Sequence, residues 1–549
     1  MMDLKMRCLD TRLEQVDSLA SIFEQADAAV VEKSVQAVAQ LPDLARCDDD
    51  DFLLAAVPPP EDADVARQVD DARAQIARMR AMIGAGKYPD ALERAESLAS
   101  KAGTLDYDPL EAEVRYWLGV SQIRTGDLDG AASSLEEGYW RSLASGHESV
   151  AVDAATELVY VIGYRKAEHG PGLSWSKHAR ALEERVEPEY SDPGRLDNNV
   201  ASLNLSSGDI SVAERFQTDA LTERRRELGE RHPEVANALL NLGNIQMAAA
   251  KYDDAEASYA AAREVYLDLL GPNHPVLGTV ETSIGNLEST RGNYESSREH
   301  FEAAIEIVTT ALGPEHTRVG NAWLGLGYAL SAAQDHPGAE EAMRRSLAIK
   351  RAAHGDMHPE VATAWSGLAD QLQTMGKLEE SHDAKKRAFE ISLKLYGEDN
   401  VNLAAPMFNL GEIERVLGQF DSAKQRFEQA LQLWTTAYGE DHPDRSYALD
   451  ALGRIADAEG DADEAVSLLE EALALRVKHF ETDSYYVTRT RFALATALTN
   501  QGASAQRPRA VELAKKARSG FETYGDTELV KDVDAWLREH SLPAAPASD

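Results

Sequence analysis

The part of the sequence richest in reactive side chains is "HGDMHPE", residues 354–360. Two histidines, an aspartate and a glutamate fall within seven residues. Such side chains bind metals and transfer protons. The stretch is therefore a metal site, a catalytic loop or a structural corner, and the rest of the chain at the same spacing decides between them.

The glycine of this stretch recurs every 42 residues, and six consecutive units keep the register without insertion or deletion. The surroundings repeat too, as "LGERHPEVA", "LGPNHPVLG", "LGPEHTRVG", "HGDMHPEVA", "YGEDNVNLA" and "YGEDHPDRS". The equivalent glycines are Gly229, Gly271, Gly313, Gly355, Gly397 and Gly439. A fixed period of this kind is the signature of a repeat array.

The histidines of the stretch have a structural explanation. His358 belongs to a column of the repeat that also holds His232, His274, His316 and His442. Histidines one repeat apart are too distant to share a metal. Asn400 and Ser484 fill the same column, and both residue types cap helix N-termini, so the column is predicted to cap and pack helix starts. His354 lies in a column otherwise filled by Leu, Tyr or Phe, which predicts a packing role.

Each unit is predicted to be a pair of helices joined by a short turn. In the unit 229–270, Pro233 stands at a first helical position and apolar residues follow at helical spacing. Asp253 and Asp254 mark the start of the second helix, where their charges favour the helix dipole.

Two kinds of small-residue column accompany this pattern. Glycine at 208, 292, 376, 418, 460 and 502 marks the turn between the helices, where positive φ is expected, and Ala250 and Gln334 replace it in two units. The column of Gly243 and those of Ala255 and Ala262 are predicted where two helix backbones approach closely.

This arrangement resembles the tetratricopeptide repeat, whose signature slots are filled in one unit by Gly243, Tyr252, Ala255, Tyr259 and Ala262. The 42-residue unit exceeds the usual length of 34 and resembles the kinesin-light-chain type of the repeat. The resemblance implies an all-α fold, a right-handed superhelical solenoid of helix-turn-helix repeats.

On this basis we count about eleven units and divide the chain into six segments. They are an N-terminal helical leader (1–48), an acidic, proline-rich joint (49–62), divergent units (63–228), regular 42-residue units (229–525), a C-terminal capping helix (526–541) and a disordered tail (542–549).

The leader contains the only two cysteines, Cys8 and Cys47. They are either two unrelated buried thiols or one disulfide between neighbouring helices, which would require an oxidising compartment. The leader resembles the segment between kinase domain and repeats in myxobacterial-type serine/threonine kinases. This resemblance implies a bacterial, kinase-associated regulatory or sensor region, with the cysteines paired outside the membrane. The kinase motifs themselves do not occur in the sequence.

Composition restricts the partners and the location. A formal net charge of −38 repels nucleic acid and anionic membranes, so neither is expected as a partner. We expect no membrane span, because no apolar run of about 18 residues occurs. A cytoplasmic location is expected, or the extracytoplasmic side if the chain is part of a membrane-anchored kinase. No catalytic, metal or cofactor motif is found, so we expect no enzyme and no cofactor.

The resemblance also places a concave groove along the first helix of each unit. The positions that it implies are Asn237, Asn241, Asn244, Thr279, Asn286, Asn321, Tyr328, Asn409, Arg415, Arg454 and Arg489. The asparagines would hydrogen-bond an extended peptide's backbone, or else line an ordinary solvated groove. Arg415, Arg454 and Arg489 would form a basic strip for an acidic peptide, or else be ordinary surface arginines. The function predicted is a protein- or peptide-binding scaffold, with the kinase-associated region as the alternative.

Overall fold

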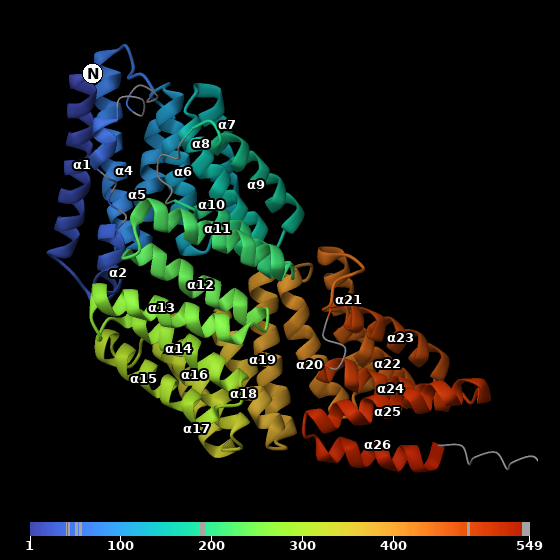
Figure 1. The fold of residues 1–549 in the computed structure, drawn as a ribbon. Helices are drawn as coiled ribbons and strands as arrows, with labels where there is room; N and C mark the ends of the chain where they lie inside the picture. Colours follow the sequence, from blue (N-terminus) through green and yellow to red (C-terminus); the bar gives the residue numbers. More distant parts are fainter. Residues whose placement is uncertain are drawn as a thin grey trace, which may run out of the picture. The chain divides into compact units, whose positions relative to one another are not determined.

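The computed structural model describes residues 1–39, 41, 44–49, 53, 57–186, 193–479 and 484–540. Over these ranges every regular element is a helix, which confirms the predicted all-α solenoid of helix pairs (Figure 1). The chain divides into two compact units, Met1–Asp335 and His336–Asp549, which we call unit 1 and unit 2 and describe separately. The six segments assigned from the sequence stay a prediction, and the tail 542–549 lies outside the described residues.

Unit 1 begins with the leader and continues with stacked helix pairs. The leader contains α1 (Met2–Phe23), α2 (Ala28–Ala39) and the 3-10 turn η1 (Leu44–Asp48). The pairs that follow are α4 (Ala63–Gly84) with α5 (Tyr88–Ala102), α6 (Asp108–Thr125) with α7 (Leu128–Ser145), α8 (Glu148–Leu158) and the π-helix η2 (Val159–Arg165) with α9 (His169–Glu183), α10 (Arg195–Ser206) with α11 (Ile210–Leu228), α12 (Pro233–Ala248) with α13 (Tyr252–Leu270), and α14 (Pro275–Thr290) with α15 (Tyr294–Leu312). The last helix is α16 (Thr317–Ala332).

Unit 2 continues the same plan. Its helices are α17 (His336–His354), α18 (Pro359–Thr374), α19 (Leu378–Tyr396), η3 (Val401–Leu403), α20 (Ala404–Val416), α21 (Phe420–Tyr438), α22 (Arg445–Glu459), α23 (Ala462–His479), α24 (Tyr485–Asn500), η4 (Ser504–Gln506), α25 (Arg507–Thr523) and α26 (Thr527–His540). The boundary between the units falls between α16 and α17, the two helices of one repeat.

The turn column adopts the left-handed backbone predicted for it. Gly292 has φ of +81°, and the two replacements follow it, with φ of +57° at Ala250 and +66° at Gln334. At the corner between repeats, Gly397 has φ 81° and ψ 174°, a region that only glycine populates readily. The chain therefore reverses direction twice in each repeat, and at both places the backbone has a positive φ.

The small-residue slot of Gly243 has a different cause from the one expected. A Cβ atom there would lie 2.5 Å from the ring of Tyr259, and one at Gly411 would lie 2.8 Å from the ring of Phe427. The slot thus makes room for an aromatic side chain of the second helix. At Gly119 and Gly453 of the same column, a backbone oxygen of the second helix also lies 3.3 and 3.4 Å from such a Cβ, as predicted.

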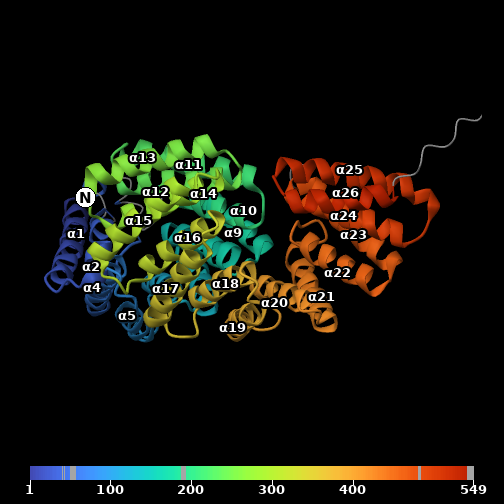
Figure 2. The same cartoon turned by 90° about the horizontal axis from the view of Figure 1, so that it is seen from below.

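The first helices of the repeats lie on the inner side of the curvature. Successive first helices approach one another, as α4 does α6, α14 does α16 and, in unit 2, α22 does α24. Over the described ranges, successive second helices approach one another less closely. In Figure 2, α11 and α13 lie at the rim of unit 1, with α14 and α16 further in. Each unit therefore presents an inner face made by its first helices.

Candidate interaction surface

The corner that contains "HGDMHPE" is a helix cap. His358 Nδ1 accepts a hydrogen bond from the backbone N–H of Glu360 at 3.2 Å, two residues into α18. The same bond is made at the other histidines of the column, His232, His274, His316 and His442. Only an imidazole with a lone pair on Nδ1 can accept this bond. The predicted capping role is confirmed at His232, His274, His316 and His358, while His442 makes the same bond to Asp444, just before α22 begins.

His354 packs on the cap. Its ring stacks on that of His358 with centroids 4.0 Å apart, and in a later repeat the ring of Tyr438 packs on that of His442 at 4.2 Å, tilted by 37°. The predicted packing role of His354 is confirmed. Glu360 Oε2 lies 3.7 Å from Lys350 Nζ, so the acidic residue of the stretch pairs with a buried lysine. Within the described ranges, no group of three or more His, Cys, Asp or Glu side chains has the arrangement of a metal site.

Burial favours the neutral form of the capping histidines. It lowers the pKa of His274, His316 and His358 below the ordinary value. At His442 burial, with a smaller effect from the nearby His479, lowers the pKa to about 4. The cap is thus in its accepting form at neutral pH.

Several of the residues predicted to line the groove are solvent-exposed on the inner face of unit 1. Thr279 and Asn286 on α14 and Asn321 and Tyr328 on α16 are all exposed. Asn286 and Asn321 make no side-chain hydrogen bond to another residue in the described part of the chain. Their amides are available to a partner's backbone.

The other three asparagines are engaged within the array. Asn237 donates to Glu234 Oε2 at 3.4 Å, and Asn241 donates to Asn198 Oδ1 at 3.0 Å, which links α12 to α10. Asn244 is exposed, but its side-chain oxygen accepts the hydroxyl hydrogen of Tyr259 at 2.9 Å. Asn241 and Asn244 therefore help to hold neighbouring helices together, whereas the Asn237 bond lies within α12.

The arginines predicted for unit 2 are mostly paired. Arg415 Nε lies 3.1 Å from Glu412 Oε1, and Arg454 Nε lies 2.7 Å from Asp450 Oδ2. Such pairs neutralise much of the charge that an acidic peptide would seek. Arg489 on α24 forms no ion pair with a described residue and is half-buried, as is Asn409 on α20.

An aromatic surface that the sequence analysis missed lies on the same helices. It consists of Phe408 on α20, Tyr447 on α22 and Tyr486 on α24, with ring centroids 6.1 Å apart between Phe408 and Tyr447 and 5.3 Å apart between Tyr447 and Tyr486. Tyr486 is 45% exposed. Each residue follows the previous one by 39 positions, one helical turn short of the repeat, so no column contains all three. That shorter spacing is the signal that would have found them.

A buried ionic network supports the two tyrosines. The Asp450 carboxylate accepts hydrogen bonds from Arg476 at 3.0 Å and Thr490 at 2.7 Å, in addition to Arg454. The Arg476 guanidinium lies over the rings of Tyr447 and Tyr486, 5.3 and 5.6 Å from their centroids. Burial opposes ionisation of Asp450, but the arginines outweigh it and hold its pKa below the ordinary value. The two tyrosines are thus held in place by groups within unit 2.

Comparison with known proteins gives family matches over much of the chain. One tetratricopeptide repeat model matches residues 192–268, 234–309, 278–352, 360–433 and 405–478, together more than half of the chain, and a second matches 76–145. No curated protein matches. No helix in the described part is long and apolar enough to cross a membrane.

Similar solved structures include repeat proteins from several sources. Putative kinesin light chain TPR-like repeats of Podosopora anserina are 23% identical over 38% of this chain and 98% of that one, with a TM-score of 0.32. BtubC (BKLC) from P. vanneervenii is 17% identical over 42% and 92%, with a TM-score of 0.36. A Rap protein complexed with Competence and Sporulation Factor is 13% identical over 71% and 97%, with a TM-score of 0.39.

Proposed function

Because the chain belongs to the tetratricopeptide repeat family, we propose that it is a protein-binding scaffold whose inner faces hold an extended segment of a partner. The observation that carries the proposal is the aromatic surface of unit 2, since Tyr486 is exposed while its ring contacts Tyr447 and Arg476. Tyrosine is one of the residue types enriched among the side chains that contribute most to binding at protein interfaces.

The partner segment proposed for unit 2 carries an apolar or aromatic side chain and a carboxylate. Arg489 follows Tyr486 by three residues on α24, so the two side chains lie on one face of the helix. An arginine guanidinium binds a carboxylate through two parallel hydrogen bonds. In unit 1, the exposed amides of Asn286 and Asn321 would donate to and accept from the segment's backbone.

Binding by unit 2 is tested by isolating partners with the full chain, identifying them by mass spectrometry, and measuring the affinity of variants. We expect Tyr486→Ala to weaken binding roughly 30-fold, the loss of about 2 kcal/mol typical of an interface anchor. Gln425→Ala and Gln429→Ala, two exposed positions on the second helix α21, are the matched controls and should bind normally. Equal affinity of Tyr486→Ala and the controls refutes the assignment.

Unit 1 is tested separately with Asn286→Ala combined with Asn321→Ala, against Thr310→Ala on the second helix α15. Weaker binding by the double variant alone assigns the segment to unit 1. Circular dichroism of each variant shows whether helix content is retained. If neither unit responds, the inner faces are not the binding surface.

The kinase-associated function expected from the leader stays a prediction. The family matches begin at residue 76, after the leader, and therefore do not address it. An upstream kinase reading frame beside this gene would support it. The compartment also stays a prediction, as does the lack of enzymatic activity, which phosphate transfer from ATP by the purified chain would contradict.

A further inference from the structure

The first helix of the leader, α1, has an exposed row of large apolar side chains, which we call the apolar stripe. Its members alternate at intervals of four and three residues, the spacing of the apolar seam along which two helices pack in a coiled coil. Their exposed fractions run from 41% at Leu9 to 79% at Met2. A contiguous apolar surface of this kind is typical of an interaction site. The apolar stripe consists of Met2, Met6, Leu9, Leu13 and Val16.

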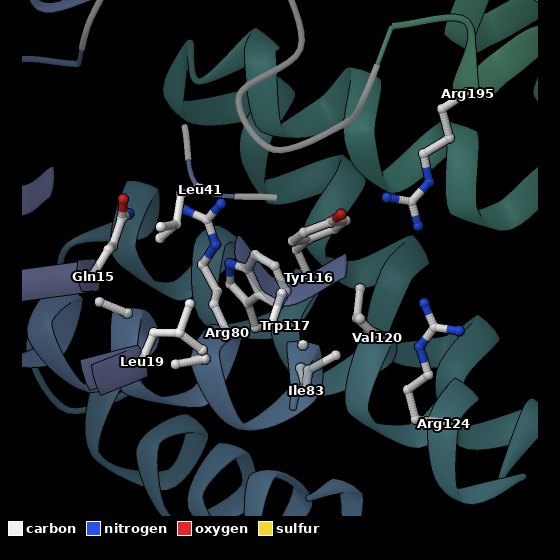
Figure 3. A pocket seen from close by; sticks show the side chains of 14 residues that line it. Gln15, Leu19, Leu41, Arg80, Ile83, Tyr116, Trp117, Val120, Arg124 and Arg195 are labelled. Carbon is white, nitrogen blue, oxygen red and sulfur yellow. The ribbon is translucent and has the colours of Figure 1, made fainter. Parts of the chain in front are cut away.

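Another side of α1 packs on the rest of unit 1. The helix contacts α4, η1 and α2, and both views place it at the edge of the unit (Figures 1 and 2). Arg12, Gln15 and Leu19 are buried on this side. Gln15 and Leu19 line a cavity of about 90 Å³ together with Trp117 of α6 (Figure 3). The helix therefore uses this side for packing within unit 1 and leaves the apolar stripe outside.

Two further contacts fix the leader in this position. On α2, the Glu32 carboxylate is 10% exposed and lies 2.6 Å from Arg318 Nη2, at the start of α16. A disulfide is drawn between Cys8 on α1 and Cys47 on η1, with Cα atoms 5.5 Å apart, and whether these cysteines pair in solution stays a prediction. Since the leader is already packed on the repeats, its own folding leaves the apolar stripe uncovered.

Acidic side chains run beside the apolar stripe. Asp10, Asp17 and Glu24 follow one another at intervals of seven residues, at the positions that border the seam of a coiled coil, and we call them the acidic border. All three are exposed, and none forms an ion pair or a side-chain hydrogen bond with the described part of the chain. On the other border, Lys5 is ion-paired with η1 and Arg12 is buried. The border that remains open to a partner is therefore acidic.

We propose that the apolar stripe of α1 is a docking surface for an amphipathic helix of a partner protein whose own apolar seam is bordered by lysine or arginine. The partner's seam would pack on Leu9 and Leu13, at the centre of the stripe. Its basic side chains would pair with Asp10 and Asp17. The inference goes beyond the binding proposed for the inner faces, because α1 belongs to the leader.

A second copy of this chain lacks the charges that the acidic border requires. Antiparallel pairing of two α1 helices would place one acidic border against the other, which is unfavourable. Parallel pairing would place it against the second copy's Lys5 and Arg12, of which one is ion-paired and the other buried within its own chain. The charges therefore favour a different protein with a basic border.

The chemistry of the partner is tested with two labelled synthetic helices of the length of α1. Both have leucine at the seam positions, and they differ in having lysine or glutamate on both borders, which keeps each peptide from pairing with itself. In fluorescence anisotropy with the full chain at moderate salt, the lysine peptide should bind roughly tenfold more tightly than the glutamate peptide. Equal affinities, or a preference for the glutamate peptide, overturn the proposal.

The contribution of the apolar stripe is measured with polar substitutions on α1. Leu9→Gln combined with Leu13→Gln should weaken binding of the lysine peptide roughly tenfold, because two side chains lose apolar contact. Thr11→Gln combined with Ser21→Gln, at exposed positions of α1 outside the stripe, is the matched control and should bind normally. Circular dichroism shows whether each variant keeps its helix content. Equal affinity of the two variants overturns the docking surface.

Charge reversals separate the acidic border from a general attraction of basic peptides to this acidic chain. Asp10→Lys combined with Asp17→Lys should reverse the preference, so that the glutamate peptide binds more tightly. Glu14→Lys combined with Glu93→Lys changes the net charge equally at exposed positions outside the border and should keep the wild-type preference. If both variants shift the preference equally, the border does not select the partner.

Two other occupants are tested with the same variants. Sedimentation velocity, and flotation with neutral phosphatidylcholine vesicles, should give the same result for wild type and for Leu9→Gln with Leu13→Gln. Dimerisation or vesicle binding by wild type alone would assign the stripe to a second copy or to a lipid surface and overturn the partner class. None of these measurements involves Tyr486 or Arg489, so their failure leaves the proposal for the inner faces standing.

Discussion

The capping histidine His442 makes the stability of unit 2 depend on pH in a way that one substitution should remove. His442 Nδ1 accepts a hydrogen bond from the backbone N–H of Asp444 at 3.3 Å, and its ring contacts the ring of Tyr438. Protonation converts Nδ1 from an acceptor to a donor and removes this bond. His442→Asn should keep a cap without the titration, because Asn400 caps η3 in the same column with a 2.9 Å bond.

The magnitude follows from the two protonation equilibria. The pKa of His442 is about 4 in the folded chain against 6.5 for the ordinary side chain. Since each pKa unit corresponds to 1.36 kcal/mol, complete titration removes at most about 3 kcal/mol. The unfolded chain binds the proton first as the pH falls. The contribution to stability is therefore complete above pH 6.5 and declines toward pH 4, with about 2 kcal/mol lost by pH 5.

Urea unfolding followed by circular dichroism at pH 7.5 and pH 5.0 measures this loss. The free energy of unfolding of wild type should fall by about 2 kcal/mol more than that of His442→Asn between the two pH values. Because each variant is compared with itself at two pH values, any pH-independent cost of losing the ring contact with Tyr438 cancels. His382→Asn, which removes a histidine outside the cap column, should keep the wild-type loss. An equal loss in His442→Asn and wild type would refute the argument.

Three further changes test other parts of the structure. Burial opposes ionisation of Glu113, but Arg73 and a neighbouring histidine outweigh it and hold its pKa at about 2. Glu113→Gln should therefore cost about 3 kcal/mol at pH 7 in urea unfolding, a cost that disappears as the pH falls from 4.5 toward 2. Gln334→Gly relieves a positive φ and should stabilise the chain by up to about 1 kcal/mol, seen as a higher Tm. Cys8→Ser with Cys47→Ser should destabilise the leader by up to about 4 kcal/mol, seen as faster proteolysis under non-reducing conditions; equal proteolysis would mean that the thiols do not pair.

Features that depend on neighbouring residues could be predicted from the sequence. The cap bond of His358 spans two residues, so its donor, acceptor and helix start all lie within one short stretch. The left-handed turn follows from a glycine column, and even the exceptions at Ala250 and Gln334 keep its φ because the surrounding repeat imposes it. The repeat of 42 residues is therefore enough to predict both the helix cap and the left-handed turn.

The contacts of the candidate groove residues were harder to predict, for two different reasons. The pairing of Arg415 with Glu412 and of Arg454 with Asp450 lies within one helical turn, so it could have been found from spacing alone. The bond from Asn241 to Asn198 joins two repeats and depends on how their helices are offset, which the column pattern does not give. Two side chains in one column occupy the same position of the repeat, but the residues that they contact in the folded chain differ.

Net charge illustrates the limit of composition most clearly. A total of −38 argues against nucleic acid and anionic membranes as partners of the chain as a whole. Yet arginines of three different helices line the cavity of unit 1, and Glu32 is buried against Arg318. Electrostatic recognition at a few ångströms depends on these local groups more than on distant surface carboxylates, whose effect is screened within about 10 Å at moderate salt.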